Sequence, residues 1–313
     1  MAYNIVIISF CISVPILIFT QRFFLKRNYT DKIISRSSHK SIATRSGGPS
    51  IFLILFIISS YFYLDGKTIY DYSFIVPLSL LVLIGLYDDI KNIDFKLKFI
   101  FQIIAAKIII DNGLIIENMH GVLGVYELSR LAGQLLTIFI IVAIINSINF
   151  IDGIDGLALS IMIVFILSIE FFSISMTPFR SISLILIPSL IALSFFNFKK
   201  EKKIFLGDSG SHLLGGIASI YVVYVLSNDY IIKQEYDLHK ILFIISVFTY
   251  PIIDMIRIFF KRLLNNKSPF EADKNHIHHL ILSKTKSHFK TTFFIILFNI
   301  IIIFTFQLIQ NFQ

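Results

Sequence analysis

Apolar residues gather in ten separate stretches of this 313-residue chain, with charged or turn-forming segments between them. Backbone amide and carbonyl groups inside a bilayer must find hydrogen bonds within their own segment, so each stretch is predicted to be a helix. With 56% hydrophobic and only 15% charged residues, the chain is too apolar for an ordinary water-soluble domain or a disordered one. We therefore expect an all-α integral membrane protein. The predicted helices cover residues 4–20, 50–64, 72–87, 99–110, 131–148, 157–176, 182–198, 210–227, 240–260 and 291–309.

The distribution of Lys and Arg predicts how these helices cross the membrane. The five segments that follow the odd-numbered helices hold 21 of the 28 Lys and Arg residues, whereas the connections on the opposite side hold five. We expect the basic segments to face the cytoplasm, with both chain termini periplasmic or extracellular. The net charge of +8 mainly reflects this asymmetry and is weak evidence for a nucleic-acid partner, so none is expected. Without a repeat or linker, residues 1–313 are interpreted as one multi-pass membrane domain.

The third apolar stretch ends in two adjacent carboxylates, Asp88 and Asp89. Two acids that repel each other at the end of an apolar helix are relieved by a divalent cation or a transferable proton. A solvated helix end is the simpler alternative. Lys98 and Gln102 follow, four residues apart, which predicts one helical face directed back toward the carboxylates.

The fifth stretch continues into a run of side chains that carry oxygen. Asn146, Asn149 and Asp152 recur every three residues and would share one face of a helix that continued there. Two Asp-Gly pairs, beginning at Asp152 and Asp155, then break the helix and allow the backbone to approach a ligand closely. Carboxylates combined with substrate phosphates are the ligands that Mg²⁺ usually takes.

The eighth stretch opens with Gly207-Asp208-Ser209-Gly210-Ser211. Glycines and hydroxyls at a helix start favour anion binding, because free amides and the helix dipole point there. Asp208 would repel a phosphate in that position unless a cation lay between them, which favours a metal-bridged phosphate. The alternative is simple N-capping of the helix by Asp208 or Ser209.

Three histidines lie within four residues near the end of the chain, at His276, His278 and His279. Zinc binding is one alternative, although no cysteine lies nearby and the spacing fits no common structural zinc site. Beside Arg262 and Lys274, these imidazoles could instead bind phosphate as hydrogen-bond donors.

These four motifs, in this order, resemble those of the polyprenyl-phosphate N-acetylhexosamine-1-phosphate transferases, glycosyltransferase family 4, from about Arg36 to Leu280. The resemblance implies about ten transmembrane helices in a bacterial inner membrane, with the active site on the cytoplasmic face. It also implies transfer of N-acetylhexosamine 1-phosphate from a UDP-sugar to undecaprenyl phosphate, with release of UMP. Mg²⁺, or Mn²⁺ in its place, is the implied cofactor, and a homodimer is an implied assembly.

The resemblance further assigns roles residue by residue. Asp88 would contact or deprotonate the lipid phosphate with Asp89 in support, and Asp208 and Asn149 would hold Mg²⁺. Whether an aspartate acts as a base or forms a covalent intermediate is left open, with single displacement preferred because the reaction mostly needs positioning and charge neutralisation. The implied substrate-binding residues are Lys96 and Lys98 at phosphates, Asp152 and Asp155 at the nucleotide (Asp155 toward uracil), His276, His278 and His279 at the diphosphate, and His39 and Arg45 in the first loop.

The motif His-x-His-His favours the branch that starts O-antigen, common antigen or teichoic-acid linkage units (WecA/TagO-like) over the peptidoglycan branch (MraY). The first loop lacks the prolines that many relatives have around Arg45, which leaves the roles of His39 and Arg45 open. An intramembrane prenyltransferase and a multi-pass transporter are the rival functions. The Gly-Asp-Ser-Gly-Ser segment has no place in the first, and no inverted repeat supports the second.

Overall fold

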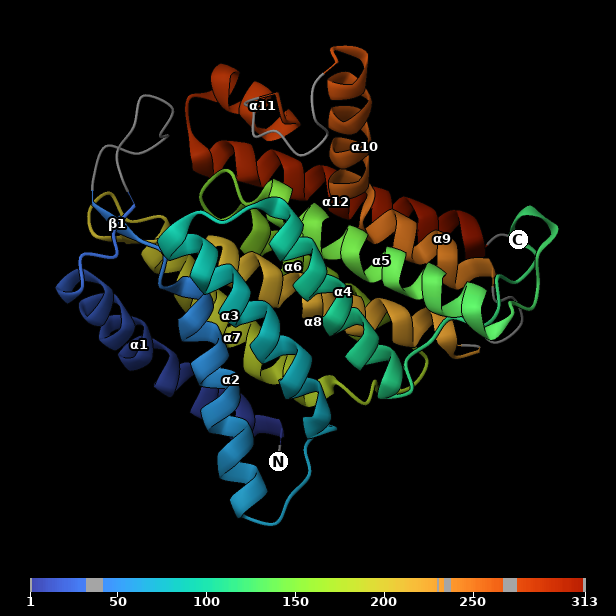
Figure 1. Cartoon of the computed structure of the whole chain (residues 1–313), viewed down its shortest axis with the longest axis horizontal. Coiled ribbons are helices and arrows are strands. Elements are labelled where there is room, and N and C mark those ends of the chain that lie inside the picture. Colours follow the sequence, from blue (N-terminus) through green and yellow to red (C-terminus); the bar gives the residue numbers. More distant parts are fainter. Residues whose placement is uncertain (1, 32–41, 230, 234–237, 267–274, 312–313) are drawn as a thin grey trace.

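The computed structural model describes residues 2–31, 42–229, 231–233, 238–266 and 275–311. Almost all of them lie in helices or in the turns between helices (Figure 1). The elements are α1 (Ala2–Lys26), β1 (Ala43–Thr44), α2 (Gly47–Leu64), η1 (Tyr72–Phe74), α3 (Ile75–Lys91), α4 (Phe95–Asp111), η2 (Val122–Gly124), α5 (Arg130–Ile151), α6 (Leu157–Phe172), α7 (Arg180–Asn197), β2 (Lys203–Ile204), α8 (Gly207–Ser227), α9 (Leu238–Val247), α10 (Thr249–Leu264), α11 (Ile277–Thr285) and α12 (His288–Asn311).

Each of the ten apolar stretches is helical, which confirms the all-α prediction. Among the described residues, seven helices are long and apolar enough to cross a membrane, and an eighth is reached if α9 and α10 form one span. The prediction of ten spans is therefore supported only in part. With 17 and 16 residues, α4 and α6 fall short of the roughly 20 residues that a straight crossing requires.

The ninth stretch is not one continuous helix. It breaks at Phe248, and α10 is bent by 74° from the direction of α9. In Figure 1, α10 projects from the bundle, whereas α11 packs against α12. This bend carries Asp254 and Arg262 to the end of the bundle where the motifs lie.

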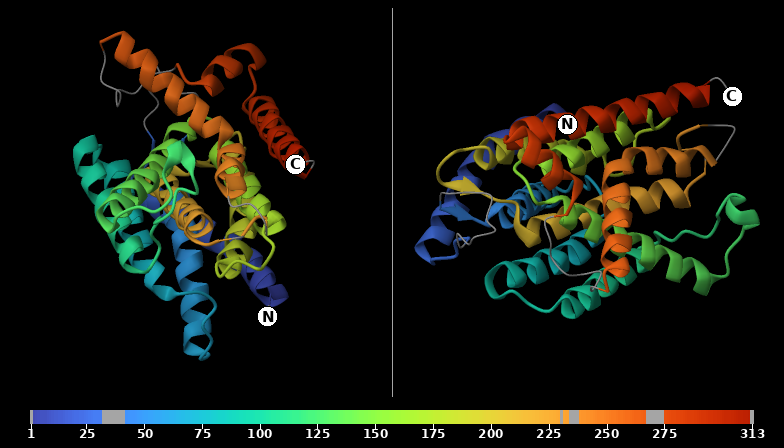
Figure 2. Two further views of the ribbon diagram at one scale, coloured as in Figure 1. Left: turned by 90° about the vertical axis from the view of Figure 1, so that its right-hand side faces the viewer. Right: turned by 90° about the horizontal axis from the view of Figure 1, so that it is seen from above.

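The most buried helix is α8, which packs against α2, α3, α5, α6 and α9. Its start approaches its neighbours closely, because a Cβ atom on Gly85 of α3 would lie 2.5 Å from Ser209 Cα, and one on Gly48 of α2 would lie 2.1 Å from Gly210 N. In contrast, α1 and α12 expose most of their surface, and both views in Figure 2 show α12 along the outside of the bundle. The packed core thus surrounds the helix that begins with Asp208.

Two short strands hold together two connections at the end of the bundle where the sequence motifs lie. Ala43 and Thr44 of β1 pair in parallel with Lys203 and Ile204 of β2. This pairing places the segment before α2 directly beside the segment before α8.

Candidate active site

Side chains of three of the four sequence motifs, together with Lys98 and Gln102, line one cavity of about 340 Å³. Its wall combines side chains from α4, α5, α8, α10 and α11, which lie up to 184 residues apart in the sequence, from Phe95 to His279. The lining residues are Phe95, Lys98, Phe99, Gln102, Asn146, Asn149, Phe150, Asp152, Gly153, Asp208, Arg262, His276, His278 and His279.

Lys98 joins the first motif to the third. Its ammonium donates to Asp88 at 2.9 Å and to Asp208 at 3.1 Å, and it extends from α4 as the four-residue spacing with Gln102 predicted. Asp88 lies directly behind the cavity wall, where it also accepts a hydrogen bond from the amide of Ile93. Burial lowers the pKa of Lys98, but the charges of Asp208 and Asp88 outweigh this and raise the pKa above its ordinary value. Lys98 is therefore charged and neutralises part of the carboxylate cluster.

Asp89 does not face the cavity but anchors the start of α8. Its carboxylate accepts hydrogen bonds from the amides of Asp208 and Ser209 at 2.9 and 3.0 Å, and from the Ser209 hydroxyl at 2.9 Å. The prediction that these amides would be free to cradle phosphate is therefore wrong, because a buried carboxylate from α3 already occupies the positive end of the helix. The alternative of N-capping by Asp208 or Ser209 is wrong as well, because α8 begins at Gly207, before both residues, and its cap residue is Leu206.

A chain of hydrogen bonds fixes the polar groups behind Asp208. The Asp208 carbonyl can only accept, so His212 donates through Nδ1 at 2.6 Å and leaves Nε2 to accept from the Gln102 amide at 3.0 Å. The Gln102 oxygen then accepts from the amide of Asn146 at 2.7 Å. This chain ties α4 and α5 to α8.

Asn149 has its orientation set by Ser211. The Ser211 hydroxyl donates to the Asp208 carbonyl at 3.2 Å, so it must accept from the Asn149 amide nitrogen at 2.8 Å. The Asn149 carbonyl oxygen is thereby left to serve as an acceptor or metal ligand. Carboxylate and amide oxygens from Asp208 and Asn149 on one cavity wall fit a hard divalent cation such as Mg²⁺.

The histidine segment also lines the cavity. His278 is fully buried, its Nδ1 lies 3.0 Å from the Tyr250 hydroxyl, and its Nε2 has no hydrogen-bond partner among the described residues. Burial, followed by the neighbouring His279 and His276, lowers the pKa of His278 to about 3. His278 is therefore neutral at physiological pH. Its Nε2 faces Gly153, where an added Cβ would approach within 2.4 Å.

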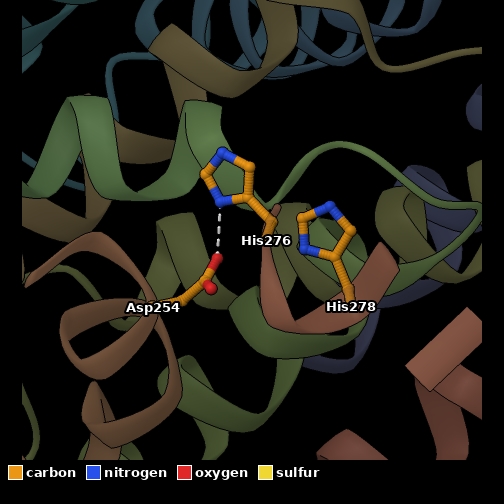
Figure 3. Close-up of side chains that lie close together, drawn as sticks. All are labelled: Asp254, His276 and His278. Carbon is orange, nitrogen blue, oxygen red and sulfur yellow. Dashed lines mark hydrogen bonds and ion pairs between the residues drawn. The ribbon is translucent and has the colours of Figure 1, made fainter. Parts of the chain in front are cut away.

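His276 lies between the carboxylate of Asp254 and the guanidinium of Arg262. Its Nδ1 is 2.7 Å from Asp254 Oδ2 (Figure 3). Its Nε2 is 3.5 Å from the Arg262 guanidinium. Arg262 is itself buried and lies 5.9 Å from the centre of the Phe150 ring. Potential ligand atoms of Asp254, His276 and His278 all lie within 4.8 Å of one another, which makes them a candidate metal-binding group in geometry.

The two acids of the Asp-Gly pairs differ in position. Asp152, at the end of α5, lines the cavity, and burial together with the charge of Asp208 raises its pKa well above the ordinary value. Asp155 lies outside the lining, where it pairs with Lys203 of β2 and approaches His288 of α12 at 3.3 Å. The structure thus brings Asp152 to the cavity but places Asp155 in an ion pair that joins two connections.

Three further predicted residues lie away from the cavity lining or cannot be placed. Arg45 pairs with Asp31 at 2.6 Å and approaches Asp89 at 3.5 Å. Lys96 is exposed at the start of α4. His39 lies outside the described residues.

The sequence interpretation missed the aromatic part of the cavity. Phe95, Phe99 and Phe150 belong to its lining, but no sequence signal separates them from the rest of the chain's 33 phenylalanines. The structural roles of Ser211 and His212 were also missed. Ser211 directly follows Gly210, and His212 lies four residues after Asp208. These positions were a usable signal, because both residues lie on the first turns of a helix that starts at the site.

Comparison with known proteins identifies the family of this chain. The sequence pattern described as glycosyl transferase family 4 matches residues 72–226, which contain the first three motifs. A probable undecaprenyl-phosphate N-acetylglucosaminyl 1-phosphate transferase of Bacillus subtilis is 30% identical, over 90% of this chain and 79% of the relative. A decaprenyl-phosphate N-acetylglucosaminephosphotransferase of Mycolicibacterium smegmatis is 32% identical, over 74% and 61% of the two chains.

An undecaprenyl-phosphate alpha-N-acetylglucosaminyl 1-phosphate transferase of Salmonella typhimurium is 29% identical, over 88% of this chain and 75% of the relative. These similarities extend across the membrane helices and the cavity, so they concern the whole arrangement rather than one motif. The chain therefore belongs to glycosyl transferase family 4, whose members similar to it are polyprenyl-phosphate N-acetylglucosamine-1-phosphate transferases.

Proposed function

We propose that this protein transfers an N-acetylhexosamine 1-phosphate from its UDP-linked form to a polyprenyl phosphate, with undecaprenyl phosphate as acceptor. An oxygen of the lipid phosphate attacks the sugar-bearing β-phosphorus, the bond to the bridging oxygen breaks, and UMP leaves with that oxygen. The observation that carries this proposal is the single cavity in which Lys98, Asp208 and the histidine segment meet. The names of the relatives favour N-acetylglucosamine as the first sugar to test.

The cavity residues supply charges for both phosphate groups. Lys98 and Arg262 offer positive charge at separate positions on the lining, and His278 offers a neutral imidazole. We assign Asp208 and Asn149 to Mg²⁺, which would neutralise the diphosphate when bound. Asp88, held by Lys98 directly behind the wall, would contact or deprotonate the lipid phosphate.

The remaining predicted roles are proposed on weaker support. Asp152 lies on the cavity wall and is assigned to the nucleotide. A uracil contact by Asp155 would require its ion pair with Lys203 to open. We therefore infer that Asp155 stabilises the fold when no substrate is bound. Asp89 acts on the site indirectly, through the start of α8.

We further propose that the protein resides in the bacterial inner membrane with the cavity on the cytoplasmic side. The excess of Lys and Arg in the connections at the motif end supports this orientation. The product would be the first lipid-linked sugar of an O-antigen, common antigen or teichoic-acid linkage unit, in cell-wall or lipopolysaccharide biosynthesis. The homodimer stays a prediction from the family resemblance.

The test is UMP release by the purified protein with undecaprenyl phosphate, Mg²⁺ and a panel of UDP-N-acetylhexosamines. Asp208→Asn should abolish UMP release, whereas Asp111→Asn, which changes an exposed acid on α4 paired with Lys107, should retain it. Release that requires both lipid and Mg²⁺ supports the proposal and identifies the donor. Folded protein that neither binds nor consumes any UDP-sugar would contradict it and favour a transporter.

A further inference from the structure

Asp254 is a fully buried carboxylate near the cavity that does not belong to its lining. Both of its oxygens are engaged, because Oδ2 lies 2.7 Å from His276 Nδ1 and Oδ1 accepts the amide of Ile277 at 2.8 Å. Arg257 adds a cation 3.6 Å from Oδ1. A buried carboxylate is tolerated only when it is paired and hydrogen-bonded in this way. Asp254 therefore joins α10 firmly to the first residues of α11.

The contact with Asp254 determines where His276 carries its proton. An ionised carboxylate only accepts hydrogen bonds, so His276 must donate from Nδ1. Its Nε2 then points toward Arg262 at 3.5 Å, as a lone pair that can accept from the guanidinium. His276 and Arg262 both line the cavity, whereas Asp254 touches it only through His276.

We propose that Asp254 is a positioning residue that fixes the orientation and tautomer of His276, and through it the place of Arg262, for binding the diphosphate of the nucleotide sugar. This inference rests on the proposed function for the identity of the ligand, but the orientation itself is a property of the protein alone. His276 and Arg262 lie 3.5 Å apart on the cavity lining, which also includes Lys98. The diphosphate is the part of the donor whose negative charge such cationic and imidazole groups would bind.

The same side chains could hold a metal ion by distance alone. Their surroundings argue against it, because the two carboxylate oxygens of Asp254 already have partners and two guanidinium groups flank the cluster. A divalent cation placed there would be repelled by Arg257 and Arg262. The structure thus favours an oriented imidazole over a metal centre.

Asp254→Asn provides a variant of nearly the same shape. The amide of Ile277 is a donor, so the Asn oxygen should turn toward it and the Asn NH₂ group toward His276 Nδ1. His276 would then have to accept at Nδ1 and carry its proton on Nε2, facing the guanidinium of Arg262. We expect KM for the UDP-sugar to rise about 10- to 100-fold, the range for loss of a charge-assisted hydrogen bond, with KM for the lipid phosphate unchanged.

The kinetic test compares Asp254→Asn, His276→Gln and the double variant, with Asp111→Asn as the matched control. If Asp254 acts through His276, the double variant should be no worse than the poorer single variant. Asp111→Asn makes the same change in an exposed acid on α4, outside the cavity lining, and should leave KM for the UDP-sugar near that of the wild type. Additive losses, an unchanged KM in Asp254→Asn, or an equal rise in Asp111→Asn would overturn the proposal.

A second measurement does not depend on activity. Nitrogen-15 NMR of histidine-labelled wild-type protein, with the His276 signal assigned by its loss in His276→Gln, should show the proton on Nδ1. A proton on Nε2 alone would contradict the inference even if Asp254→Asn failed to fold. A metal ion that the purified wild-type protein holds and folded Asp254→Asn lacks would contradict it as well. If the wild type released no UMP, the proposed function would fail while this spectrum still decided the orientation.

Discussion

At the scale of single residues, the ammonium group of Lys98 allows two carboxylates, Asp88 and Asp208, to be held close to one cavity wall. Without it, each carboxylate would face a like charge in a half-buried position, which is unfavourable. In the proposed reaction, the same position would let Lys98 turn to a substrate phosphate while Asp208 held Mg²⁺. Lys98 is thus the cation whose loss should affect the reaction most.

We expect Lys98→Gln to lower kcat/KM about 10- to 100-fold, the range for loss of one charge-assisted hydrogen bond in the transition state. Lys96→Gln, two residues earlier on the same helix, should have a much smaller effect because Lys96 is exposed. The measurement is UMP release by both variants at matched protein levels. Equal losses would show that the phosphate is bound outside the observed cavity.

A second residue-scale prediction concerns pH. His278 has its pKa lowered to about 3 in the folded protein, against an ordinary value of 6.5. Between these values the unfolded chain binds more protons than the folded one, so His278 makes the free energy of unfolding decrease as the pH falls below about 6.5. The melting temperature in detergent should therefore fall less steeply from pH 7 to pH 5 in His278→Asn than in the wild type. Identical pH slopes would mean that this imidazole is protonated in the folded protein.

At the scale of elements, the sequence predicted helices well and their contacts poorly. Every apolar stretch is helical, because backbone groups in an apolar environment have few other ways to be satisfied. The break at Phe248 was missed although Pro251 was a usable signal for it, because proline lacks an amide donor and is tolerated in the first turn of a helix but not in its interior.

Within the site, residues that share a helix were easier to place than residues that meet across helices. The spacing of Asn146, Asn149 and Asp152 predicted a common face, and all three line the cavity. Asp89 lies at the start of α8 because it contacts Asp208 and Ser209, which are 119 and 120 positions further along the chain. No local sequence pattern encodes such a contact.

Close helix packing leads to a prediction for Gly85. A Cβ atom there would lie 2.5 Å from both the Asp208 carbonyl oxygen and Ser209 Cα, and backbone atoms cannot move aside as a flexible side chain can. Gly85→Ala should therefore push α3 away from α8, lower the stability by about 1–3 kcal/mol, and reduce activity by displacing Asp208. Thermal unfolding and UMP release test this.

Leu83→Ala is the matched control, because Leu83 lies on α3 and is 62% exposed. It should leave both the melting temperature and the activity close to wild type. If Gly85→Ala behaves like Leu83→Ala, the helices approach each other less closely than described.

At the scale of the whole molecule, most of the basic residues and the candidate active site lie at the same end of the bundle. The connections that carry the motifs also carry most of the Lys and Arg residues, and the paired strands β1 and β2 lie among them. A basic surface attracts both anionic lipid headgroups and a nucleotide sugar. An enzyme that joins a water-soluble donor to a membrane lipid needs its cavity at this boundary.

The orientation can be tested with single cysteines. Cys11 is the chain's one cysteine, so Cys11→Ser gives a background without thiols. Leu123→Cys lies on a connection of the opposite side, where Leu123 is 92% exposed, and Glu201→Cys lies in the exposed connection before β2. In intact spheroplasts, a membrane-impermeant maleimide should label position 123 but reach position 201 only after permeabilisation. The reverse pattern would place the cavity outside the cell, where UDP-sugars are not made, and would contradict both the topology and the proposed reaction.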